Sequence, residues 1–292
     1  MKINGEHSRI SSLLIATDGS VYADVATESG AWLAARLDSG ITALYVIDAR
    51  LLAGHFVRHI SEVLENFPSE GIVERVRDYY RRQGEEALKR AARICERHGV
   101  KCETKLETGN VVKVIADEST KTDILVIGER GEDEEFETGF IGSVSEKLVR
   151  KVNRPVLLTG LEVREFRRAL LAYDGSEGAR EAMKMLALLA TRLGLEVDAV
   201  QMVEEGEPTT ALKEVISYFK DYPVHLSTHY LIGDSHSLII DHAKETRCDL
   251  MVWVLTTIGW RRASRSGQLQ IIWCTQVRFQ YSCTTNWIRC FV

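Results

Sequence analysis

Three short polar motifs in the first half of the sequence lie beside apolar runs. An Asp-Gly-Ser triplet begins at Asp18, residues 128–131 are Gly-Glu-Arg-Gly, and residues 142–145 are Gly-Ser-Val-Ser. Glycines let a main chain approach phosphate oxygens closely, and a helix N-terminus offers N–H groups with partial positive charge. Ser143 and Ser145 can donate hydroxyl hydrogens, while Asp18 can hold a ribose or a divalent cation. These residue types together suit a phosphorylated nucleoside.

Each motif also has a plainer explanation when it is taken alone. A glycine after a strand is usually a turn residue, and a serine before a helix is usually its N-cap. The combination is harder to explain as separate turns, because both glycine motifs follow one apolar strand and only ten residues, 132–141, separate them. The pattern therefore favours one shared binding site.

The elements that must position these motifs alternate between strands and helices. Short apolar runs are typical of strands buried on both faces of a parallel sheet, and apolar residues at three- and four-residue spacing predict amphipathic helices. The predicted strands include 13–17, 41–47, 123–128 and 155–159, and the predicted helices include 22–38 and 77–99. This alternation predicts an α/β, doubly wound, Rossmann-like fold, in which ligands bind at the carboxyl ends of the strands where the strand order reverses.

The second half of the chain repeats the first. A second Asp-Gly-Ser triplet begins at Asp174, and residues 230–253 match residues 106–128. We therefore predict two tandem domains, each with a five-stranded parallel sheet: copy one at 1–162 and copy two at 163–292. Copy one is longer before the matching segment, and we interpret residues 51–78 as a helical insertion.

The composition excludes several classes of protein. The chain is 45% hydrophobic with a net charge of −5, and it has neither a long apolar span nor a signal-like start, which predicts a cytoplasmic protein that binds neither membranes nor nucleic acid. Six irregularly spaced cysteines predict neither a disulfide framework nor a zinc site. We interpret His236 and His242 as ordinary helix residues, and no P-loop motif is present.

The glycine motifs resemble those of the ATP-binding branch of the universal stress protein family. Members carry Gly-x-x-Gly, a spacer slightly shorter than the one here, and then Gly-Ser or Gly-Thr. The matching residues are Asp18, Val46, Gly128, Gly131, Gly142, Ser143, Val144 and Ser145. The resemblance extends from residue 10 to about residue 252. It implies that copy one holds ATP with Mg²⁺ or Mn²⁺, with Asp18 and the Val46 main chain at ribose and adenine and the glycine loop at the phosphates.

The resemblance implies a nucleotide-binding regulatory or stress-response protein. Hydrolysis of ATP is expected to be slow or absent, because no residue is evidently placed as a general base. One alternative is an enzyme of related fold, such as an ATP-pyrophosphatase or a flavoprotein, although residues 16–20 do not match the Ser-Gly-Gly-x-Asp-Ser loop of the former. The other alternative is an interaction module in which the glycines only form turns.

The composition changes abruptly at residue 253. Residues 253–292 hold four of the five Trp and no Asp, Glu or Lys. Read one frame over, their codons permit Gly, Gly-Ser and Pro-Val-Leu, with the last spaced as Pro155 is from Gly142. We interpret this segment as frameshifted, so that copy two is truncated or scrambled after about residue 252. The resemblance implies pairing through last strands, so an unpaired last strand in copy one predicts a homodimer.

Overall fold

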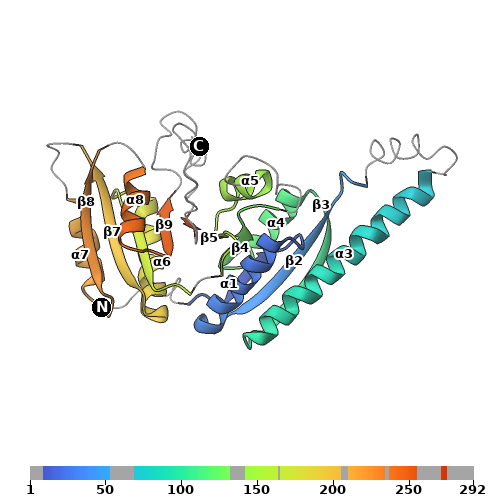
Figure 1. Cartoon of the computed structure of the whole chain (residues 1–292), viewed down its shortest axis with the longest axis horizontal. Helices are drawn as coiled ribbons and strands as arrows, with labels where there is room; N and C mark the ends of the chain where they lie inside the picture. Colours follow the sequence, from blue (N-terminus) through green and yellow to red (C-terminus); the bar gives the residue numbers. More distant parts are fainter. Residues whose placement is uncertain are drawn as a thin grey trace.

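The computed structural model of the chain describes most of both copies. The described residues are 9–52, 69–131, 142–163, 165–204, 210–233, 237–254 and 271–274, and for 69–72, 253–254 and 271–274 only the main chain is described. The helical insertion predicted at 51–78 and the frameshift predicted at 253–292 therefore lie largely outside the described residues. Figure 1 shows the chain with copy two at the left and copy one at the right.

The fold is built on one ten-stranded sheet of order β3-β2-β1-β4-β5-β10-β9-β6-β7-β8. Neighbouring strands within each copy are parallel, and copy two repeats the order of the first four strands of copy one. The strands are β1 (Ser12–Ala16), β2 (Gly40–Asp48), β3 (Cys102–Gly109), β4 (Ile124–Gly128), β5 (Val156–Thr159), β6 (Arg168–Ala172), β7 (Glu196–Val203), β8 (Leu226–Ile232), β9 (Leu250–Val254) and β10 (Ile271–Cys274). The predicted tandem doubly wound fold is confirmed, while the domain boundary after residue 162 stays a prediction.

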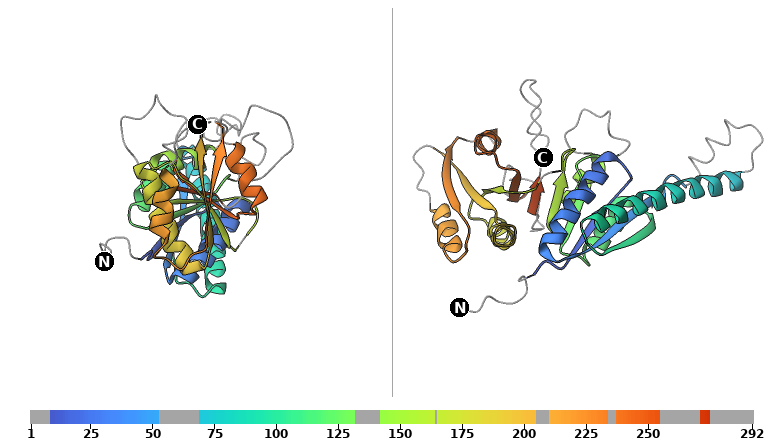
Figure 2. Two further views of the ribbon diagram at one scale, coloured as in Figure 1. Left: turned by 90° about the vertical axis from the view of Figure 1, so that its left-hand side faces the viewer. Right: turned by 60° about the horizontal axis from the view of Figure 1, so that its bottom comes forward.

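Helices cover both faces of the sheet. One face packs against α1, α3, α6 and α7, and the other against α4, α5 and α8. The helices are α1 (Val21–Leu37), α3 (Ser69–Arg97), α4 (Val111–Ser119), α5 (Ser143–Lys151), α6 (Glu177–Leu193), α7 (Ala211–Phe219) and α8 (Ser237–Glu245). A view along the sheet shows the strands fanned by their right-handed twist (Figure 2, left).

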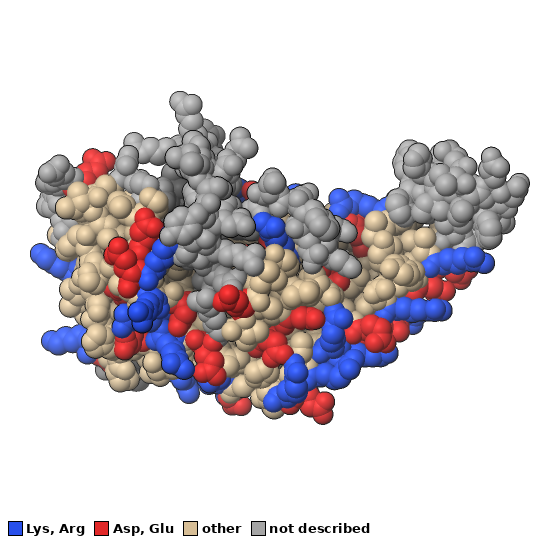
Figure 3. Space-filling view, in the orientation of Figure 1, with Lys and Arg blue, Asp and Glu red and all other residues tan. Residues whose placement is uncertain are grey.

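Helix α3 accounts for much of the extra length of copy one. It has 29 residues, whereas its counterpart α7 has nine, and its first turns extend beyond the sheet (Figure 1). Acidic and basic side chains alternate along it (Figure 3), with ion pairs such as Arg81–Glu85 at 3.1 Å. Among the described residues, none of the helices combines the length and apolarity needed to cross a membrane.

One apolar core joins the two copies. It includes buried side chains from α1 and α6 together with residues of the sheet between them. The Trp32 ring of copy one meets the Phe166 ring edge-on, with 5.0 Å between centroids, and both are buried. The Arg36 guanidinium lies over the Trp32 ring, 4.1 Å from its centre, and pairs with Glu165 at 3.5 Å. The copies therefore fold against each other rather than as separate bodies.

The junction between the two copies is formed by β10, a strand that the sequence analysis did not predict. β10 pairs in parallel with β5 at 156–158 and antiparallel with β9 at 251–254. The strands of the two copies consequently run in opposite directions, as a pseudo-two-fold arrangement requires. The expectation of an open β5 edge is wrong, because β10 of the same chain binds its main-chain groups, so this edge no longer supports a homodimer.

In each copy, an aspartate just before one strand binds main-chain N–H groups at the start of the neighbouring strand. Asp123 Oδ2 accepts hydrogen bonds from the main-chain N–H groups of Ser11 and Ser12 at 2.8 and 3.0 Å, and from both hydroxyls. Asp249 makes the matching contacts in copy two, with the N–H groups of Arg167 and Arg168. Burial alone would raise the pKa of the Asp123 carboxyl, but the hydrogen bonds outweigh it and hold the pKa below the usual 3.8.

We predict that Asp123→Asn lowers the free energy of unfolding by about 1–2 kcal/mol at neutral pH, because a charge-assisted acceptor is lost. A depressed carboxyl pKa stabilises the fold above the unfolded-state value of 3.8 and ceases to do so as pH falls through the folded value. The difference between wild type and variant in urea unfolding should therefore vanish at acidic pH. An equal loss from the exposed control Asp117→Asn, or a pH-independent difference, would contradict this role.

We also predict that a chain ending at Val254 associates, because it leaves the β5 main chain at 156–158 unpaired. The complete chain should stay monomeric at the same micromolar concentration. Light scattering after size exclusion measures both, and either a dimeric complete chain or a monomeric shortened chain would contradict the assignment of β10.

Candidate functional site

The predicted site residues gather at the carboxyl ends of three adjacent strands. Asp18 follows β1, Val46 lies near the end of β2, and Gly128 is the last residue of β4. β1 pairs with β2 on one side and with β4 on the other, so the strand order reverses between β1 and β4. A doubly wound sheet opens a crevice at such a reversal point.

Asp18 and Gly131 lie close together in this crevice. The turn at Asp18 is held by the Ser20 N–H group, which donates to Asp18 Oδ1 at 3.0 Å. Gly19 makes this turn possible with a φ of +87°, a backbone conformation that L side chains rarely adopt. A Cβ atom added at Gly131 would lie 2.7 Å from Asp18 Oδ2. The glycine loop and the aspartate, which are more than 100 residues apart in the chain, therefore meet as the motifs predicted.

Gly128 has a structural role that the motif did not reveal. A Cβ atom at this position would lie 2.8 Å from Tyr22 Cβ and 3.0 Å from the Tyr22 carbonyl carbon. Real Cβ atoms essentially never come within 2.8 Å of a neighbouring atom, and Tyr22 Cβ cannot move without the main chain of α1, so helix α1 can lie this close to β4 only if residue 128 is glycine. The packing of the fold thus explains this glycine without any ligand.

Ser145 and Gly142 close the base of the glycine loop. The buried Ser145 hydroxyl donates to the Gly128 carbonyl oxygen at 2.8 Å, and the Gly142 N–H group donates to the Glu129 carbonyl oxygen at 2.7 Å. Both donors already have acceptors, so the Ser145 hydroxyl and the Gly142 N–H group shape the loop rather than supply hydrogens to a phosphate. Residues 132–141, with their acidic side chains, lie outside the described residues.

The N-terminus of α5 differs from those of α1 and α4. Ser20 and Asn110 cap the latter two helices with side-chain oxygens, whereas Gly142, the N-cap of α5, makes no side-chain cap hydrogen bond. N–H groups in a first turn have no acceptor within their own helix and carry partial positive charge. Ser143 is exposed at this terminus, so the residues after Gly142 can accept an anion there.

Val46 and Val144 line the apolar side of the site. Both are partly buried against one core cluster on the α4 and α5 face, which includes Leu14 and Leu44. Ligand sites commonly combine an apolar wall with a few polar groups. Val46, near the end of β2, and Val144, in the first turn of α5, are therefore the apolar members of the candidate site.

Arg90 is a residue of this region that the sequence analysis missed. Its Nη2 donates to the Gly19 carbonyl oxygen at 2.5 Å, and its Nε pairs with Asp24 at 3.1 Å. It comes from α3, about seventy residues along the chain, and its own neighbourhood carries no motif. The contact depends on how α3 packs beside α1, which no local pattern reports.

Copy two keeps the first part of the site. The Ser176 N–H group donates to Asp174 Oδ1 at 3.0 Å, and Gly175 has a φ of +79°. The counterpart of the glycine loop would follow β9, at residues that the structure does not describe. Only copy one therefore presents both halves of the candidate site within the described residues.

Comparison with known proteins identifies one family. The family model described as "Universal stress protein family" matches residues 10–160. A universal stress protein from Synechocystis sp. is 23% identical over 252 residues, covering 82% of this chain and 88% of the relative, and one from Methanocaldococcus jannaschii is 29% identical over 157 residues, covering 53% and 84%. The crystal structure of a universal stress protein from Archaeoglobus fulgidus superposes with a TM-score of 0.67 at 20% identity, covering 91% of this chain and 98% of that chain.

We predict that Gly128→Ala lowers the free energy of unfolding by about 1–3 kcal/mol, because the added Cβ atom collides with the Tyr22 main chain. The matched control is Gly40→Ala, since a Cβ atom at Gly40 meets nothing within 4 Å. Chemical denaturation without nucleotide measures both variants. Equal stability of the two variants would show that α1 does not need this glycine.

Proposed function

Because the chain belongs to the universal stress protein family, we propose that copy one binds ATP together with Mg²⁺ or Mn²⁺ and acts as a regulatory protein of the stress response. The proposal concerns a nucleotide-holding protein rather than an enzyme. Copy two is not included, so one nucleotide is expected for each chain. The cytoplasmic location stays a prediction.

The contact between the Asp18 carboxylate and Gly131 supports this proposal most directly. A side chain at residue 131 would fill the space against Asp18 Oδ2, so the main chain of the loop borders the turn directly. A polar group of the ligand can then contact the carboxylate and the loop main chain together. The reversal of strand order between β1 and β4 is also where nucleotides bind in this class of sheet.

The proposed roles follow from what each residue has to offer. Asp18 is exposed, and its carboxylate is a group that suits a ribose hydroxyl or a cation. The main chain of Val46 would meet the adenine beside the apolar wall. Ser143 and the first-turn N–H groups of Val144 and Ser145 would meet the phosphates.

A divalent cation is proposed because Asp18 and the phosphates of ATP would otherwise repel each other. Asp18 and a triphosphate are both anionic, so their proximity is favourable only with a cation between them or with the carboxylate directed to the ribose. Mg²⁺ is commonly held by one or two carboxylates together with substrate phosphates. Arg90 holds the turn after Asp18 in place by donating to the Gly19 carbonyl oxygen.

We predict that Asp18→Asn weakens ATP binding at least tenfold in calorimetry with Mg²⁺, a loss of about 1.4 kcal/mol or more. Asparagine keeps an oxygen for the Ser20 N–H group, so the turn survives while the charge is removed. Asp174→Asn is the matched control, because Asp174 makes the same turn in copy two.

Two outcomes would contradict the proposal. Equal weakening by Asp18→Asn and Asp174→Asn would show that Asp18 is not a specific ligand. An absence of ATP binding by the wild type would favour the interaction-module alternative. Turnover well above a buffer blank that Asp18→Asn abolishes would contradict the expectation of slow hydrolysis.

A further inference from the structure

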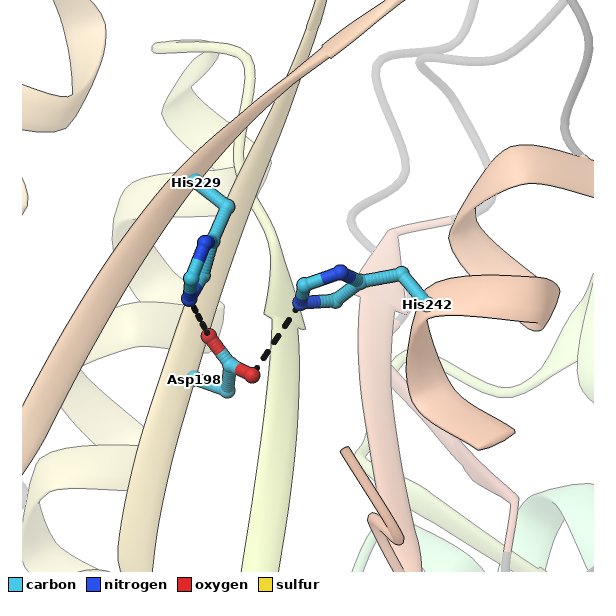
Figure 4. Close-up of side chains that lie close together, drawn as sticks. All are labelled: Asp198, His229 and His242. Atoms are coloured by element: carbon cyan, nitrogen blue, oxygen red, sulfur yellow. Dashed lines mark hydrogen bonds and ion pairs between the residues drawn. The ribbon is translucent and has the colours of Figure 1, made fainter. Parts of the chain in front are cut away.

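Asp198, His229 and His242 converge in copy two from three different elements. Asp198 lies on β7, His229 on the adjacent β8, and His242 on α8, which covers that face of the sheet (Figure 4). His229 Nε2 lies 3.2 Å from Asp198 Oδ1, and His242 Nε2 lies 3.1 Å from Asp198 Oδ2. The two rings are 4.7 Å apart between centroids. Each imidazole thus directs a nitrogen at a different oxygen of one carboxylate.

The carboxylate at the centre of this cluster is buried. The Asp198 side chain is 5% exposed, and the His242 side chain is 12% exposed. Within the described residues, Asp198 Oδ1 makes no hydrogen bond of good geometry despite its proximity to His229, whereas Oδ2 accepts one from His242. A buried carboxylate without sufficient partners is costly, and a bound cation is a common way to compensate its charge.

Arg168, a cationic side chain near Asp198, already has other partners. Arg168 is close enough to Asp198 for their charges to interact. Its guanidinium forms an ion pair with Glu196 and donates to the Thr246 carbonyl oxygen at 3.0 Å. The two imidazoles are therefore the groups that face the carboxylate directly.

We propose that Asp198, His229 and His242 bind a divalent transition metal ion of the zinc type. The three ligand atoms lie within 4.8 Å of one another. A tetrahedral Zn²⁺ ion with bonds of about 2.0–2.1 Å keeps neighbouring ligands about 3.3 Å apart, and each imidazole nitrogen lies about that far from one of the two Asp198 oxygens. Two imidazole nitrogens and one carboxylate oxygen are ligands that zinc accepts, whereas Mg²⁺ and Ca²⁺ prefer oxygen alone.

The exposure of the ligands provides a route for the ion. His229 is 47% exposed while Asp198 is buried, so an ion can enter from the His229 side. Three protein ligands leave a fourth position of a tetrahedral ion for water or another small ligand. The bound ion would tie β7, β8 and α8 together.

Copy one provides an internal comparison for the site. The strand registers align Asp198 and His229 with Thr42 and Lys105, and the matching burial patterns of α4 and α8 align His242 with Glu118. At this place in copy one, Lys105 Nζ pairs with Glu118 Oε1 at 2.8 Å. An ordinary ion pair thus joins the strand and the helix in copy one, and a set of metal ligands takes its place in copy two.

The proposed site differs from two expectations that the sequence supports. The sequence indicates that His242 is an ordinary helix residue, and the cysteine spacing predicts no zinc site. The ligands are separated by 31 and 13 residues and include no cysteine, so neither a CxxC pattern nor a His-x-x-x-His pattern marks them. Only the pairing of β7 with β8 and the packing of α8 bring them together.

The test is a zinc titration of the complete, metal-stripped chain against a chromophoric chelator. We compare wild type with His229→Gln, and use His225→Gln as the control, because His225 is an exposed histidine at the start of the same strand. We expect His229→Gln to lose one zinc equivalent or at least about tenfold in zinc affinity. His225→Gln and the copy-one variant Glu118→Gln should match wild type.

A second measurement uses Co²⁺ and the variant Asp198→Asn. Wild type with one Co²⁺ should show the intense visible absorption of tetrahedral cobalt without a thiolate charge-transfer band, and Asp198→Asn should abolish it. Identical zinc binding by wild type, His229→Gln and Asp198→Asn would overturn the proposal, as would a thiolate band in the first Co²⁺ equivalent. Because ATP binding is assigned to copy one, failure of either proposal leaves the other unchanged.

Discussion

The close approach of α1 to strands β1 and β4 sets the position of the main chain at the candidate nucleotide site. Gly128 sets the limit, because a Cβ atom there would lie 2.8 Å from Tyr22 Cβ; a Cβ atom at Gly30 would lie 2.8 Å from Ile15 Cδ1, the end of a side chain. Because interiors pack densely, added carbon atoms move α1 away from the sheet. The turn at Asp18 leads directly into α1, so such a movement would separate it from the glycine loop.

The two copies share one fold but have different side chains at equivalent positions. The same strand order, aspartate turn and strand-entry carboxylates recur in both, since they satisfy main-chain groups that the fold cannot leave unpaired. Side chains at equivalent surface positions have no such constraint. This freedom explains why Lys105 and Glu118 form an ion pair in copy one while His229 and His242 face a buried aspartate in copy two.

Features of the fold that depend on residues adjacent in the chain could be predicted from the sequence. The apolar runs and the Asp18 turn could be predicted because buried strands and short turns have their own residue preferences. The role of Gly128 could not, since it depends on Tyr22 across a helix–strand contact. The pairing of β10 with β5 was also missed, because the sequence of 253–292 has no pattern that indicates which strand it pairs with. Arg90 and Asp198 act through contacts made only after folding.

The central claim is that ATP binds where the Asp18 turn meets the glycine loop and the α5 N-terminus of copy one. Hydrogen–deuterium exchange with and without saturating ATP and Mg²⁺ tests it most directly, because it reports individual segments of the unaltered chain. The account predicts slower exchange at 18–20, 128–131 and 143–146, with no change at the equivalent turn 174–176. Protection at 174–176, or unchanged exchange in all three copy-one segments while ATP is bound, would contradict it.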